Sequence, residues 1–82
     1  MEANKAIELI EKTDTDFDIK NRKYKGLQIL SKYVEELDFV AEHDIVYICD
    51  FESTVKKMTE EEVKNLALHG LLYSEDSWAF FT

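Results

Sequence analysis

Three residues of this chain have side chains that could carry chemistry: Cys49, His43 and His69. A thiolate and two imidazoles are ligands that zinc accepts, and a cysteine beside a histidine can act as a nucleophile. A structural zinc site takes four ligands, usually with a close Cys-x-x-Cys or His-x-x-x-His pair, and the chain contains neither spacing. Cys49 also lies inside the apolar run 45–50 (IVYICD), where we expect a buried, unreactive thiol. We therefore predict neither a metal site nor a catalytic cysteine.

Two polar motifs resemble parts of known sites without completing them. Residues 14–18 (DTDFD) have the spacing that opens a calcium loop, but the positions that require Gly and Glu hold Ile19 and Lys25. The pair His43-Asp44 could orient an imidazole for catalysis, or it could form a turn before the apolar run. Because no catalytic or cofactor-binding set is complete, we expect a protein that is not an enzyme and has no cofactor.

Charge is distributed unevenly along the chain. The 82 residues include 18 Asp or Glu against 10 Lys or Arg, a net charge of -8. Residues 1–34 contain seven cations and six acids, whereas residues 35–82 contain three cations and twelve acids. This balance disfavours direct contact with nucleic acid or an anionic membrane. The acidic half could instead imitate a polyanion and occupy a cationic groove on a nucleic-acid-handling protein, or it could simply keep the domain dispersed.

We predict that a basic protein partner contacts acids on the best-defined elements of the acidic half. The predicted contacts are Glu60, Glu61, Glu75, Asp76, Glu52 and Asp50. The basic run 20–25 (KNRKYK) has the composition of a nucleic-acid contact, but we favour its pairing with the protein's own acidic half or simple solvation.

The apolar pattern predicts a single α+β domain over residues 1–82. The expected order is ααβαββ, with helices packed against a mostly antiparallel three-stranded sheet. Helices are predicted at 3–12, 22–36 and 59–69, and strands at 45–50, 70–73 and 77–81, with 38–41 as a further hairpin arm across 42–44.

The helix at 59–69 has the strongest local signals. Thr59 and Glu62 have the spacing of a capping box, and Met58 with Val63 has that of a hydrophobic staple. Gly70 then supplies a left-handed stop. The last two strands flank residues 74–77 (SEDS), for which we expect a four-residue loop around a type I turn, because Glu-Asp suits a mirror-image turn poorly. Trp78 is expected in the core, with an interface anchor as the alternative.

The chain has one cysteine, and therefore no internal disulfide, and it has no apolar stretch near the roughly 20 residues that span a bilayer. Its first residues, MEANKAIELIEK, also lack the basic start and uncharged run of a signal peptide. We expect a cytoplasmic protein with no membrane partner.

The sequence AEHD at 41–44, the strand IVYICD, MTEEEV at 58–63, and then Gly70 and Trp78 resemble small acidic proteins that phages and prophages encode. In general character these proteins are similar to anti-CRISPR inhibitors. The resemblance covers about the last half of the chain and implies a phage-encoded inhibitor or modulator that works by binding. The alternative is a general interaction module or small homodimer that uses no electrostatic inhibition.

Overall fold

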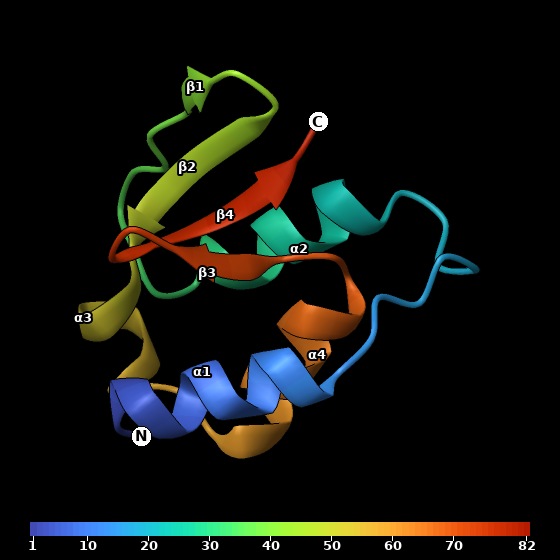
Figure 1. Ribbon diagram of the computed structural model, residues 1–82. Coiled ribbons are helices and arrows are strands. Elements are labelled where there is room, and N and C mark those ends of the chain that lie inside the picture. Colours follow the sequence, from blue (N-terminus) through green and yellow to red (C-terminus); the bar gives the residue numbers. More distant parts are fainter.

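A four-stranded antiparallel sheet and four helices make up the computed structural model, which describes residues 1–82 (Figure 1). In chain order the elements are α1 (Ala3–Lys12), α2 (Arg22–Leu30), β1 (Val40–Glu42), β2 (Ile45–Asp50), α3 (Phe51–Val55), α4 (Glu60–Leu68), β3 (Leu72–Ser74) and β4 (Ser77–Phe81). The strands lie in the order β1-β2-β4-β3. Helix α2 lies behind the sheet in Figure 1, and α1, α3 and α4 lie together below β3. The α+β class predicted from the sequence is confirmed.

Several elements match their predicted bounds because local signals specify them. Helix α1 and strands β2 and β4 begin and end as predicted. In α4 the Thr59 hydroxyl accepts a hydrogen bond from the Glu62 N–H at 3.2 Å, and the Glu62 carboxylate accepts one from the Thr59 N–H at 2.9 Å. Met58 and Val63 are both buried, as a staple requires, and Gly70 follows the helix with φ of 89°.

The second helix is shorter than predicted, since α2 ends at Leu30 and not at residue 36. The Ser31 hydroxyl donates to the Gln28 carbonyl at 2.7 Å, and the next backbone bonds reach back only three residues. A side chain that bonds the backbone in this way competes with helix propagation. Leu37 still packs against the core although no helix carries it, so its helical spacing was misleading.

Helix α3 was missed and β1 was not counted among the predicted strands, so the prediction of three strands in the order ααβαββ is corrected to ααββααββ with four strands. Helix α3 follows β2 without a loop. Strand β1 was expected only as an optional arm at 38–41, and it pairs with β2 over Val40–Glu42 across a two-residue turn at His43 and Asp44. A five-residue helix and a three-residue strand are too short to show a periodic apolar pattern.

The turn between β3 and β4 also differs from the predicted four-residue loop. Ser74 pairs with Ser77, so only Glu75 and Asp76 form the loop, and their φ angles are 45° and 64°. Positive φ at both central residues is the signature of a mirror-image type I′ turn, whose twist matches the twist of paired strands. The fit to the hairpin therefore outweighs the poor intrinsic preference of Glu-Asp for this conformation.

The core lies between the sheet and the helices and is centred on Trp78. The Trp78 indole is fully buried, its ring centroid lies 4.9 Å from that of Phe51, and its Nε1–H donates to the Thr54 hydroxyl at 2.9 Å. Core packing is thus confirmed for Trp78, and the interface-anchor alternative is wrong because the ring is inaccessible. The indole bond also ties α3 to β4.

Candidate acidic interaction surface

Asp50 lies where β2 passes directly into α3 and holds that junction in place. Its carboxylate accepts a hydrogen bond from the Ser53 N–H at 2.9 Å, which caps the helix. This bond is the largest cause of a pKa for Asp50 below its ordinary value. Asp50 is therefore ionised at neutral pH, exposed, and fixed in orientation at the first turn of α3.

The β3–β4 turn carries two more predicted contacts, of which Asp76 lies beside α3 and Glu75 contacts Tyr47 of β2. The Tyr47 hydroxyl donates a hydrogen bond to the Glu75 carboxylate at 3.1 Å, and the Tyr73 hydroxyl donates one to the Asp76 carboxylate at 3.0 Å. The bond to the Asp76 carboxylate raises the pKa of Tyr73 above its ordinary value. The Asp76 carbonyl also accepts a bond from the Phe51 N–H at 2.9 Å, so the turn and α3 are joined through the backbone.

Three of the predicted contacts line one pocket between α1, α3 and the β3–β4 turn. The pocket has a volume of about 430 Å³ and is lined by Ala3, Asn4, Ile7, Asp50, Phe51, Glu52, Tyr73 and Asp76. A neighbouring hollow shares Ala3, Asn4 and Glu52 with it and adds Met1, Glu2 and Lys56. We call Glu2, Asp50, Glu52, Glu75 and Asp76 the acidic surface.

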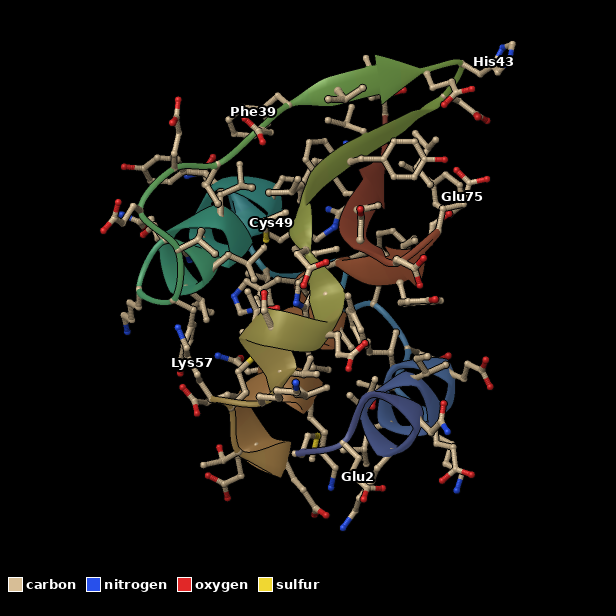
Figure 2. The ribbon with its side chains drawn as sticks, turned by 90° about the vertical axis from the view of Figure 1, so that its left-hand side faces the viewer. Glu2, Phe39, His43, Cys49, Lys57 and Glu75 are labelled. Atoms are coloured by element: carbon tan, nitrogen blue, oxygen red, sulfur yellow. The ribbon has the colours of Figure 1, made fainter.

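Figure 2 faces this part of the molecule, with Glu2 at the bottom and Glu75 at the right. Lys56 is the one Lys or Arg that lines either hollow, and it forms a 3.8 Å ion pair with Glu52 between two exposed side chains. Such a pair contributes little to stability and is screened by salt. The N-terminal ammonium of Met1, which also lines the second hollow, donates to the Val55 carbonyl at 2.7 Å.

Glu2 was not predicted as a contact, because it lies in the half of the sequence where charges nearly balance. It reaches this surface only through the packing of α1.

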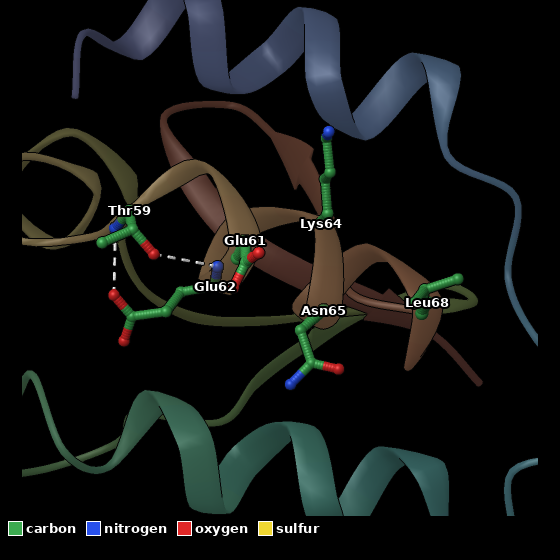
Figure 3. A pocket seen from close by; sticks show the side chains of 6 residues that line it. All are labelled: Thr59, Glu61, Glu62, Lys64, Asn65 and Leu68. Carbon is green, nitrogen blue, oxygen red and sulfur yellow. Dashed lines mark hydrogen bonds between the residues drawn. The ribbon is translucent and has the colours of Figure 1, made fainter.

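The two predicted contacts on α4 do not belong to the acidic surface. Glu60 forms an ion pair with Lys5 of α1; the hydrogen bond between them lowers the pKa of Glu60 and raises that of Lys5. Glu61 lines a separate hollow of about 450 Å³ on α4, together with Thr59, Glu62, Lys64, Asn65 and Leu68 (Figure 3). The predicted set of six therefore divides into four grouped acids and two others.

The residues with possible chemistry lie on different elements. Cys49 is half-buried on β2, and its burial, followed by the nearby Asp50 charge, raises the pKa of the thiol to about 11. Cys49 lies opposite Trp78 and packs against the core but keeps some exposure, so the expectation of a buried Cys49 is corrected to partial burial. At neutral pH a thiol with this pKa is protonated and weakly nucleophilic.

The two histidines lie at the ends of secondary-structure elements. His43 is exposed in the β1–β2 turn with φ of 59°, and the buried His69 ends α4 with its Nδ1 2.6 Å from the Asn65 carbonyl oxygen. No three His, Cys, Asp or Glu side chains are grouped so that they could hold a metal ion.

The basic run 20–25 makes no ion pair with the acidic half. The chain has two ion pairs, Lys5–Glu60 and Lys56–Glu52, and neither involves this run. Instead, Arg22 stacks over the Phe17 ring at 4.7 Å, and Lys23 lies 5.2 Å from the centroid of Phe80. The internal pairing that we considered is therefore absent: Lys20 and Lys25 are exposed, whereas Arg22 and Lys23 are half-buried against aromatic rings.

Comparisons of this chain with protein-family models, with curated proteins and with solved structures found no match. No helix in the structure combines the length and apolar character needed to cross a membrane.

Proposed function

We propose that this chain is a non-catalytic, phage-encoded binding protein of the host cytoplasm that inhibits or modulates a basic nucleic-acid-handling protein, as anti-CRISPR inhibitors do. The observation that carries the proposal is the convergence of Asp50, Glu52 and Asp76 on one pocket, with Glu2 in the adjoining hollow. Four carboxylates beside one lysine and the N-terminal ammonium produce a net negative potential that a cationic groove would match.

The hydrogen bonds within the acidic surface support this role. Asp50 and Asp76 are each held by a bond from a neighbouring group, so less side-chain freedom is lost when a partner binds. The carboxylates remain exposed at the surface, where they attract an approaching partner over roughly a Debye length, about 8 Å at physiological salt. Steering of this kind acts mainly on the association rate.

The test begins with a pull-down from the native host, identified by mass spectrometry, followed by association kinetics with the captured protein. The double variant Glu2→Lys/Glu52→Lys changes the charge of the acidic surface. Glu2 is the N-cap residue of α1, but its side chain makes no capping hydrogen bond, and the cap of α3 is Asp50 and not Glu52. The matched control is Glu35→Lys/Glu36→Lys, which makes the same charge change at exposed positions outside the acidic surface.

We expect the Glu2/Glu52 variant to associate about tenfold more slowly at low salt, with a smaller difference at moderate salt, because steering is screened. The control should slow association by much less. Equal slowing in both variants would mean that only net charge matters, and unchanged rates would remove the acidic surface from the mechanism.

A further inference from the structure

The side chains of β4 point alternately toward the helices and away from them. Trp78 packs on Phe51 of α3, and Phe80 lies beneath Lys23 of α2, so these two rings face the helices. Successive side chains of a strand point to opposite faces of its sheet. Ala79 and Phe81 therefore point to the face on which no helix packs.

Strand register extends this uncovered face across the whole sheet. One row runs through Val40, Tyr47, Ala79 and Leu72, which lie opposite one another on the four strands. In the next row Ile45 lies opposite Phe81. We call these six residues the outer sheet face. In Figure 2, α2 lies to the left of the strands and Glu75 to the right, and no helix covers the strands on the side of Glu75.

Two members of the outer sheet face are strongly exposed, with Val40 and Phe81 each at 58% of their full accessible surface. Ile45, Tyr47 and Leu72 are half-buried, and Ala79 is covered by its larger neighbours. Single exposed apolar side chains are normal on any protein, whereas adjoining ones such as these are a feature of interaction sites.

The charged side chains of the strands and of their hairpin turns are all acidic. Residues 39–50 and 71–82, which include all four strands and both hairpin turns, contain no Lys or Arg. Glu42 ends β1, Asp44 lies in the following turn, and Glu75 is bonded to the Tyr47 hydroxyl at the opposite end of the strands. An apolar centre with a polar rim is the usual anatomy of a protein–protein interface.

We infer that the outer sheet face receives one amphipathic helix of a basic protein partner, with an apolar stripe at its centre and Lys or Arg on its flanks. Four strands spaced about 4.8 Å apart are roughly 14 Å across, which accommodates one helix about 10–12 Å in diameter. A helix there would complete a three-layer arrangement, since the opposite face already holds α2.

The acidic rim favours this partner over a second copy of the chain. A copy docked through the same face would bring Glu42, Asp44 and Glu75 against an equally acidic rim, and each copy carries a net charge of -8. Like charges placed together across an interface oppose binding. The inference rests on the proposed function only in that both take the partner to be basic, and it does not require that partner to handle nucleic acid.

The test uses a fluorescently labelled synthetic helical peptide with a leucine stripe flanked by lysines, and a matched peptide with glutamates in place of the lysines. Binding is measured by anisotropy against wild type, Phe81→Asp and Phe39→Asp. Phe39 is 57% exposed, as Phe81 is, but it lies on the side of α2 in Figure 2. Both substitutions add the same negative charge. A loss of affinity for the lysine peptide that only Phe81→Asp causes therefore reports the apolar contact.

We expect wild type to bind the lysine peptide and not the glutamate peptide, with Kd raised about tenfold or more by Phe81→Asp and unchanged by Phe39→Asp. Amide chemical shifts should move at Tyr47 and Ala79 when the peptide binds. Equal affinity of the two aspartate variants would overturn the inference. So would a wild-type dimer, seen by sedimentation, that Phe81→Asp dissociates, because a second copy would then be the occupant.

The two proposals can fail separately. If Phe81→Asp abolishes peptide binding while the Glu2/Glu52 variant associates normally with the host protein, the outer sheet face stands and the proposed function fails. The reverse pattern supports the acidic surface and removes the helix-docking site.

Discussion

Replacement of Thr54 by valine tests the link between α3 and the core. Thr54 is 1% exposed, and its hydroxyl accepts the indole Nε1–H of Trp78 at 2.9 Å while donating to the Phe51 carbonyl at 2.8 Å. Valine has nearly the same shape, so no cavity forms, but the buried indole N–H loses its acceptor. A buried donor left without a partner costs about 1–3 kcal/mol.

That cost is a large part of the expected stability, because a domain of this size has a free energy of unfolding of about 4–12 kcal/mol. Urea unfolding followed by Trp78 fluorescence measures it directly, since Trp78 is the single tryptophan of the chain and lies at the site. We expect a lower midpoint with an unchanged m-value. Thr54→Ser is the control: it keeps the hydroxyl and removes one methyl group, which should cost about 0.8 kcal/mol or slightly more. If valine proves as stable as the wild type, Trp78 does not depend on this hydroxyl, and our account of how α3 is held is wrong.

Three other predictions concern single side chains. Thr59→Ala should lower the free energy of unfolding, measured in urea, by about 1 kcal/mol through loss of the α4 cap. A variant whose free energy of unfolding lies within about 0.2 kcal/mol of the wild-type value would contradict the capping role. The pKa of Asp50 is lower in the folded than in the unfolded chain, so its contribution to stability is present above the unfolded-state value and is lost as pH falls through the folded-state value. Asp50→Asn should therefore flatten the acid side of a plot of stability against pH, and an unaltered acid limb would count against the Ser53 bond. Cys49 should react slowly with a thiol reagent at neutral pH and faster as pH approaches its pKa of about 11; fast labelling at neutral pH would show a thiolate that burial does not suppress.

The elements that could be predicted from the sequence are those whose signals are local. The capping box at Thr59 and the β-branched run at 45–50 depend on neighbours a few residues away, and both elements form where expected. Strand β1 and helix α3 depend on contacts outside their own short segments, because β1 pairs with β2 and the Thr54 hydroxyl of α3 accepts the bond from Trp78. Glycine is unfavourable inside a helix on propensity alone, yet Gly26 is buried in α2 against Leu71, whose side chain occupies the space that a Cβ would need.

The acidic character of the candidate site could be predicted from the sequence, but the grouping of its residues could not. An excess of acids in residues 35–82 follows from counting, but counting cannot show which acids meet. Glu60 and Glu61 follow one another in the chain and diverge, because one reaches Lys5 and the other lines the hollow on α4. Glu2 and Glu52 are 50 positions apart and line the same hollow because α1 packs beside α3.

The scarcity of ion pairs gives salt two opposite effects on this protein. The chain has 18 acids, 10 cations and two ion pairs. Repulsion among the acids of the folded chain therefore exceeds the attraction within its ion pairs. Added salt screens that repulsion and should make the fold more resistant to urea. The same salt should weaken attraction to a basic partner. If complex formation falls as sodium chloride is added, unfolding of this chain is therefore not the cause, and the slope of affinity against salt reports the contact alone.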